Sequence, residues 1–162
     1  MKLPLWFAIC CFCGSVFALE APGGAVVLTV SGNVSQPNRG KEAVFTMDQL
    51  TKLPQISFTT QTPWYDKPVK FTGPLLKDVL AAAGAKGEKI TLIALNDYRV
   101  EIPYSDVAHY PVVLARLMND KPMPIREKGP LFIVYPYDKH EELQKELYYT
   151  RSIWQLSKIN MQ

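Results

Sequence analysis

The chain has 162 residues, of which 18 are lysine or arginine and 15 are aspartate or glutamate, so its formal net charge is +3. A charge this balanced argues against nucleic acid or an anionic membrane surface as the main partner. Hydrophobic residues make up 48% of the chain, and residues 19–162 are expected to form a single domain of ordinary size.

Residues 1–18 have the features of a secretory signal peptide. Lys2 lies near the start, an apolar stretch follows, and Val16-Phe17-Ala18 gives the small-x-Ala ending that suits signal peptidase. A retained membrane anchor is the weaker interpretation, because the apolar stretch is short for a bilayer span. We therefore predict a periplasmic protein that is cleaved near Ala18 and has no membrane anchor.

The position of the cysteines limits the chemistry of the mature chain. All three lie inside the predicted signal peptide, at positions 10, 11 and 13. Residues 19–162 therefore contain no disulfide, no thiolate nucleophile and no thiolate metal ligand.

The first half of the chain predicts short strands and helices in alternation. Residues 26–30 alternate as a strand, and Thr46-Met47-Asp48-Gln49 is a capping-box pattern that opens a short helix ending at Pro54. Strands are expected again near residues 56–58 and 69–71. Between them, residues 59–68 (TTQTPWYDKP) are expected to form a polar loop, which is an unusual place for two adjacent large aromatic residues.

The clearest predicted helix follows Thr72-Gly73-Pro74, with Pro74 in its first turn and Gly84 at its end. Its apolar residues recur on one face at helical spacing, which is typical of a core helix. These residues are Leu75, Leu76, Val79, Leu80 and Ala83.

The second half predicts mainly strands. A hairpin is expected with its turn at Asn96-Asp97, and a turn-rich segment at residues 119–122 joins two further strands. The expected elements are strands at residues 90–95, 98–102, 112–118 and 131–135, a solvated helix at 141–148 and a last strand within 152–161. Together these elements predict an α+β domain with a mostly antiparallel or mixed sheet and two or three short helices.

No familiar catalytic motif is present in the sequence. His109 and His140 are the only histidines, and their spacing is not that of metal ligands. The chain also lacks a nucleophile-elbow serine, a phosphate-binding loop and a dinucleotide glycine motif.

Polar and aromatic residues instead gather in segments where turns are expected: Trp64, Tyr65, Asp97, Tyr98, Arg99 and Arg126. A flat heterocycle would use such a set, because an aromatic face stacks, a carboxylate accepts from paired N–H groups, and arginine meets carbonyl or anionic groups. Structural roles are the alternative. Trp64 could close the end of a sheet, Asp97 could serve the turn, and Arg126 could be an ordinary solvated side chain.

Several motifs resemble the oxidoreductase molybdopterin-binding domain of sulfite oxidases and of periplasmic methionine-sulfoxide-reducing molybdoenzymes. The most specific are FTGPLLKDVLAAAG and NDKPMPIREKGPL, and the resemblance runs from about Leu28 to Ile159. It implies the sulfite-oxidase-type fold, an α+β domain around a mixed sheet with the pterin in a cleft lined by loops.

One departure from that family concerns the metal. In its enzymes a cysteine after an early strand ligates molybdenum, and the equivalent place here lies near Thr60 and Gln61. A hydroxyl or an amide does not replace a soft, charged thiolate. The redox activity that depends on this ligand is therefore not expected from the chain alone.

The sequence is also similar to short, exported, stand-alone members of the family. This resemblance implies that the chain binds a metal-free pterin and reports on it to membrane-spanning signalling proteins, including enzymes of cyclic dinucleotide turnover. Trp64 and Tyr65 would supply the stacking surface, and Asp97 would read the amino-pyrimidine edge. The remaining candidates for the cleft are Tyr98, Arg99, Arg126 and Arg151.

Three functions thus remain open from the sequence. The first is a periplasmic pterin-binding module without catalysis, which contacts an inner-membrane sensor. The second is a molybdenum cofactor oxidoreductase whose metal takes a non-cysteine ligand or is completed by a partner subunit. The third is an interaction domain with a collapsed cleft.

Overall fold

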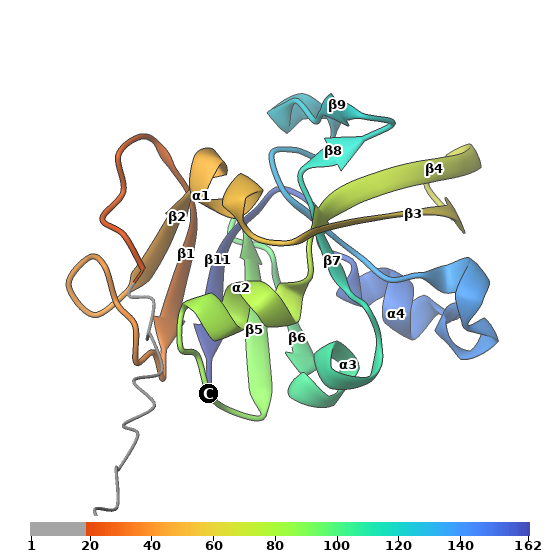
Figure 1. Cartoon of the computed structure of the whole chain (residues 1–162). Helices are drawn as coiled ribbons and strands as arrows, with labels where there is room; N and C mark the ends of the chain where they lie inside the picture. Colours follow the sequence, from red (N-terminus) through yellow and green to blue (C-terminus); the bar gives the residue numbers. More distant parts are fainter. Residues whose placement is uncertain (1–18) are drawn as a thin grey trace, which may run out of the picture.

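Five strands form the larger sheet of the structure, a computed structural model that describes residues 19–162 (Figure 1). The predicted signal peptide lies outside these described residues. Across the sheet the order is β2 (Ala43–Thr46), β1 (Val26–Gly32), β11 (Leu156–Met161), β5 (Lys89–Ala94) and β6 (Arg99–Pro103). β1 and β11 run parallel, whereas the other neighbours run antiparallel. The sheet is mixed, and the predicted hairpin of β5 and β6 is confirmed.

A second, antiparallel sheet has the order β3 (Gln55–Thr62), β4 (Tyr65–Pro74), β8 (Leu117–Met118) and β9 (Lys121–Pro122). A separate strand pair joins β7 (Val113–Ala115) to β10 (Phe132–Val134). Residues 112–118 were expected to form one strand, but they change sheets at Arg116. The reason is that the Arg116 amide donates to the carbonyl of Thr72 while its side chain donates to Gln55 at 2.8 Å.

The expected polar loop at residues 59–68 is instead a tight β-hairpin. β3 continues to Thr62, β4 begins at Tyr65, and only Pro63 and Trp64 form the turn between them. The prediction was wrong because a threonine-rich strand was interpreted as a loop on polarity alone, although threonine suits a pleated surface. In Figure 1 this hairpin reaches away from the larger sheet, on the side where α4 lies.

Four short α-helices lie among residues 19–162, one more than the upper expectation. They are α1 (Met47–Lys52), α2 (Leu76–Ala82), α3 (Tyr104–His109) and α4 (Glu146–Arg151). The capping box of α1 is present, because the hydroxyl of Thr46 accepts from the Gln49 amide and the Gln49 side chain accepts from the Thr46 amide. Three 3-10 turns, η1 (Ile125–Glu127), η2 (Tyr137–Lys139) and η3 (Glu141–Leu143), complete the set.

Two predicted helices have different bounds in the structure. Pro74 does not open α2 but ends β4, where it pairs with Gln55. The helix expected at residues 141–148 is divided into η3 and α4. α3 was not predicted, because its apolar pattern is only one turn long.

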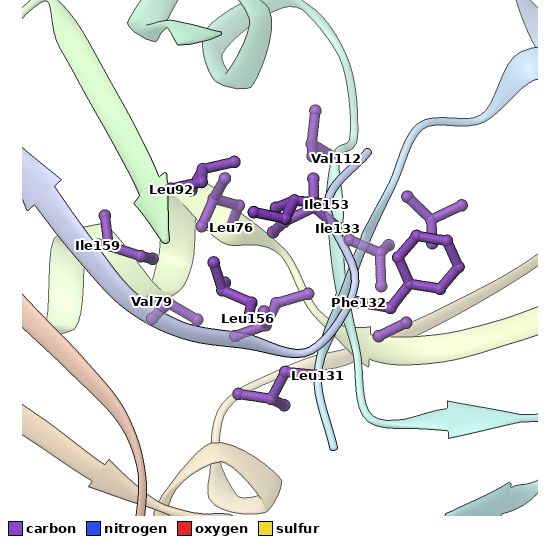
Figure 2. Packing of buried hydrophobic residues seen from close by; sticks show 14 of the residues in the cluster. Leu76, Val79, Leu92, Val112, Leu131, Phe132, Ile133, Ile153, Leu156 and Ile159 are labelled. Atoms are coloured by element: carbon purple, nitrogen blue, oxygen red, sulfur yellow. The ribbon is translucent and has the colours of Figure 1, made fainter. Parts of the chain in front are cut away.

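The main core lies between α2 and the larger sheet. Figure 2 shows Leu76 and Val79 of α2 directed toward Leu92 of β5 and toward Leu156 and Ile159 of β11. All five side chains are buried. The α+β fold class is confirmed, and α2 is the core helix that its periodicity predicted.

Within the described residues, no helix is both long enough and apolar enough to cross a membrane.

Candidate functional site

A cleft of about 580 Å³, here called the main cleft, lies where three segments of the chain meet. The β3–β4 turn contributes Pro63 and Trp64, and the β5–β6 hairpin contributes a second wall. Residues 146–154 contribute the third. The residues that line it are Pro63, Trp64, Ala94, Asn96, Tyr98, Glu146, Tyr149, Thr150, Ser152, Ile153 and Trp154. Its volume lies in the range that proteins use for small organic ligands.

Trp64 is the centre of an aromatic cluster at one wall of the cleft. Its ring centroid lies 5.5 Å from that of Phe132, 5.9 Å from Trp154 and 6.1 Å from Tyr149. The contacts with Trp154 and Tyr149 are edge-to-face, which is the favoured geometry for aromatic pairs. Trp64 therefore has a fixed orientation while it still lines the cleft.

A cation lies over the ring of Trp154. The Nζ atom of Lys128 lies 3.9 Å from a ring centroid of Trp154 and 5.9 Å from that of Tyr65. Burial lowers the pKa of the Lys128 ammonium. The same burial raises the pKa of the Tyr65 phenol, and Glu127 adds to that shift. Beside the cleft, the ammonium group of Lys128 thus packs against aromatic rings.

The β5–β6 turn presents alternate residues to the cleft. Asp97 adopts a left-handed conformation with φ of 65°, and its amide donates to the carbonyl of Ala94. The side chain of Asn96 accepts from the Tyr98 amide at 3.2 Å. Asn96 and Tyr98 line the cleft, whereas Asp97 and Arg99 are not among its lining residues.

The two remaining arginine candidates lie elsewhere. Arg126 is in η1, where its side chain is 86% exposed and 3.7 Å from the carboxylate of Glu127. Arg151 is at the end of α4, where it donates to the buried carboxylate of Asp106 at 2.8 Å. Neither residue lines the main cleft.

A buried polar network holds α4 beside the cleft. Asp106 accepts from Arg151 and from the hydroxyl of Tyr135, and Tyr137 is hydrogen-bonded to Ser152. Burial raises the pKa of Tyr135 and of Tyr137 well above the usual value. The network fixes the segment from which Glu146 and Tyr149 reach the cleft.

The place expected for a metal-ligating cysteine does not suit molybdenum. Thr60 is buried, and its hydroxyl accepts from the Asp138 amide at 3.1 Å. The backbone amide of Gln61 donates to the Asp138 carboxylate, and the side-chain amide of Gln61 donates to the carbonyl of Tyr65. Hydroxyl and amide groups are poor replacements for a soft thiolate. Within residues 19–162, no group of three or more histidine, cysteine, aspartate and glutamate side chains is placed to hold a metal ion.

The model of the oxidoreductase molybdopterin binding domain matches residues 24–139. The chain belongs to this family. No curated protein matches it.

The family match ends before the third wall of the main cleft. Residues 146–154, which include α4 and Trp154, lie beyond residue 139. The motif-based resemblance was expected to run on to Ile159. The matched domain therefore supplies two walls of the cleft, and the C-terminal segment of this chain supplies the third.

Sequence reasoning found part of the cleft. Trp64 and Tyr98 line it, and Tyr65 lies behind it against Lys128. The polar and aromatic lining residues that were missed are Asn96, Glu146, Tyr149, Thr150, Ser152 and Trp154. The segment LYYTRSIW is richer in aromatic residues than is usual for a solvent-exposed helix. This composition could have indicated that the segment contributes to the cleft.

Proposed function

We propose that the chain is a non-catalytic periplasmic protein that binds a metal-free pterin in the main cleft. The observation that carries this proposal is the combination of an aromatic wall at Trp64 with polar groups in the same cleft, in a chain of the molybdopterin-binding family without a cysteine in residues 19–162. A pterin is flat, aromatic and rich in hydrogen-bonding edges, so a cleft of this chemistry suits it.

The polar groups of the cleft match the edges of a pterin. Glu146 is the one carboxylate among the described lining residues, and a carboxylate is the natural acceptor for the paired amino and ring N–H groups. Asn96 offers an amide that both donates and accepts. In this proposal Trp64 stacks, Glu146 reads the amino-pyrimidine edge, and Asp97 supports the turn that presents Asn96.

The second part of the proposal is that cleft occupancy is relayed to an inner-membrane signalling partner. Two of the six exposed large hydrophobic side chains in residues 19–162 line the cleft, and two more are chain neighbours of lining residues. Tyr98 and Trp154 line it, and Leu95 and Leu147 are chain neighbours of lining residues. Exposed apolar side chains gathered at one place are typical of a protein-contact surface. A partner that covers the opening of the main cleft would respond to whether the ligand is bound.

The ligand is tested on protein purified from its native periplasm and then denatured. Pterin fluorescence and mass spectrometry for molybdenum are measured on the released material. We expect pterin without molybdenum. Molybdenum in equal amount to the chain would overturn the metal-free proposal and favour the alternative, a molybdenum cofactor oxidoreductase. No pterin on release, and none bound on titration with reduced pterins, would leave an interaction domain.

The relay is tested separately by the binding of purified protein to inner-membrane vesicles, with and without added pterin. We expect pterin to increase binding and Leu147→Glu to weaken it. Tyr104→Glu is the matched control, because Tyr104 is also exposed but lies in α3 and does not line the cleft. Equal binding with and without pterin would contradict the relay.

A further inference from the structure

β3 is the outermost strand of its sheet, with β4 on one side and, within residues 19–162, no strand on the other (Figure 1). Its sequence, QISFTTQT, contains no charged residue and no proline. Exposed strand edges pair readily with other chains, so natural proteins protect them with charges, proline, bulges or very short strands. The irregularity in the pairing of β3 lies near its end, between Thr60 and Thr62. Residues 55–59 therefore form an unprotected edge, here called the β3 edge.

The other outer strands of the two larger sheets are protected. Asn38 covers β2, because its side chain accepts from the Val44 amide at 2.7 Å and donates to the Val44 carbonyl at 2.9 Å. β6 carries the exposed charges of Arg99 and Glu101. β9 has only two residues and ends in Pro122. The β3 edge is therefore the exception among these outer strands.

The direction of the backbone groups of β3 follows from its pairing with β4. Opposite residues of an antiparallel pair either bond to each other or direct their N–H and C=O groups away from each other. The backbone amide and carbonyl of Lys70 bond to Asn119, and the Thr72 carbonyl accepts from an amide between β7 and β8. Both residues thus use the side of β4 that faces away from β3. Their partners on β3, Thr59 and Ser57, therefore direct their backbone groups outward.

The same alternation extends to Gln55, so three residues present N–H and C=O groups along the β3 edge. In the described part of the chain, the backbone groups of these residues have no hydrogen bond outside the β3–β4 pair. The run ends at Gln61, whose amide donates to the carboxylate of Asp138 at 2.8 Å. Backbone groups need partners, and a further strand would supply them to residues 55–59.

We propose that two copies of the chain associate through the β3 edge, with β3 antiparallel to β3 of the second copy about a twofold axis. An axis through Ser57 places Ser57 opposite itself and Gln55 opposite Thr59. Each of these opposite pairs then exchanges both backbone hydrogen bonds. The register uses every outward-facing residue of the β3 edge and stops before Gln61, whose amide is occupied. The two four-stranded sheets become one continuous sheet.

The side chains of β3 suit a second copy of the same strand. The opposite pairs of outward-facing residues are uncharged, so no like charges meet across the axis. On the other face Ile56 lies opposite Phe58, and aromatic–β-branched pairs are favourable across strands. A strand of a charged partner would find no charge to match. The contact is isologous, which is the commonest symmetry of homo-oligomers, and it does not depend on the proposed ligand.

Sedimentation velocity of the processed chain, residues 19–162, tests the association from micromolar to millimolar protein. We expect a monomer–dimer equilibrium. Ser57→Lys and Ser57→Glu should each weaken it about tenfold or more, because like charges then lie opposite each other. An equal mixture of the two variants should restore the dimer, which also shows that both are folded. Ser105→Lys and Ser105→Glu are the matched controls, since Ser105 is an exposed serine of α3.

A single cysteine locates the axis. The Cα atoms of a hydrogen-bonded antiparallel pair lie about 5.5 Å apart, which a disulfide can span. Residues 19–162 contain no cysteine, so mild oxidation should link Ser57→Cys into a covalent dimer and leave the control Ser105→Cys monomeric.

Three results would overturn the proposal. They are a native chain that stays monomeric at millimolar concentration, a dimer that the Ser57 charges do not weaken, and a dimer in which Ser57→Cys does not cross-link. A monomeric native chain that loses its binding to inner-membrane vesicles in Ser57→Lys would assign the β3 edge to a strand of another protein instead.

Discussion

The rings of Trp64 and Trp154 meet edge to face, with centroids 5.9 Å apart and planes at 78°. The contact joins the β3–β4 turn to the segment after α4, although ninety residues of sequence separate the two positions. It brings the C-terminal segment of the chain against the part that matches the molybdopterin-binding family. The contact joins two walls of the main cleft.

Trp64→Ala should weaken pterin binding by about 1 to 3 kcal/mol, because base–aromatic stacking has that magnitude. Trp64→Phe should retain most of the affinity, since a smaller aromatic face remains. Tyr104→Ala serves as a control for aromatic truncation away from the cleft. Fluorescence titration with one pterin measures all three variants. An unchanged affinity in Trp64→Ala would remove this side chain from the site.

Glu146→Gln should weaken pterin binding by about 1.5 to 3 kcal/mol, the usual range for a hydrogen bond to a charged group. Asp97→Asn should change it by less than about 0.5 kcal/mol, because Asp97 does not line the main cleft. Titration of the two variants with the same ligand separates the carboxylate that the sequence suggested from the one that the fold brings to the cleft. A larger loss in Asp97→Asn would reverse these roles.

Asp106→Asn should lower the free energy of unfolding by about 3 kcal/mol, because it removes the buried charge partner of the partly buried Arg151 guanidinium. Glu101→Gln breaks the exposed ion pair with Lys89, whose groups lie 3.0 Å apart, and should cost less than about 1 kcal/mol. Urea unfolding measures both. Similar small losses would mean that the Asp106–Arg151 pair contributes no more than a surface pair.

Alkaline pH should destabilise the protein through Tyr135 and Tyr137. Burial raises the pKa of both phenols in the folded state, whereas in the unfolded chain they titrate near the ordinary value of about 10. Above that pH the unfolded state loses protons that the folded state retains, so stability is fully present below about pH 10 and falls as pH rises toward the folded-state pKa values. Urea unfolding at pH 8 and at pH 11 measures the slope.

Tyr137→Phe supplies the control for that slope, because it removes one of the two raised phenols. The variant should lose less stability between pH 8 and pH 11 than the unaltered protein does. An identical slope in both proteins would show that other groups cause the alkaline loss.

Thr62→Val should raise the stability of the ligand-free protein by about 1 to 3 kcal/mol, because it removes a buried hydroxyl that has no partner among the described residues. Thr59→Val should change stability by less than about 0.5 kcal/mol, since its side chain is exposed. Thermal or urea unfolding without ligand gives the comparison. A loss of stability in Thr62→Val would indicate that a buried water already satisfies the hydroxyl.

The sequence by itself determined the elements whose signals are local. The capping box at Thr46, the apolar face of α2 and the Asn96-Asp97 turn each depend on residues within a few positions, and the structure contains all three. The motifs also determined the family, because they keep residue types at fixed spacing along the chain. Trp64 and Tyr98 were found for a similar reason, since aromatic residues are unusual in expected turns.

Only the tertiary structure decided which side chains share a cleft. Glu146, Tyr149 and Trp154 share a cleft with Trp64 because β11 inserts between β1 and β5, which draws the C-terminal segment back into the centre of the fold. Arg151 turns away from the cleft because the buried carboxylate of Asp106 lies within 2.8 Å of its guanidinium. These contacts join residues far apart in the sequence, and their energies depend on burial and geometry that no local pattern contains.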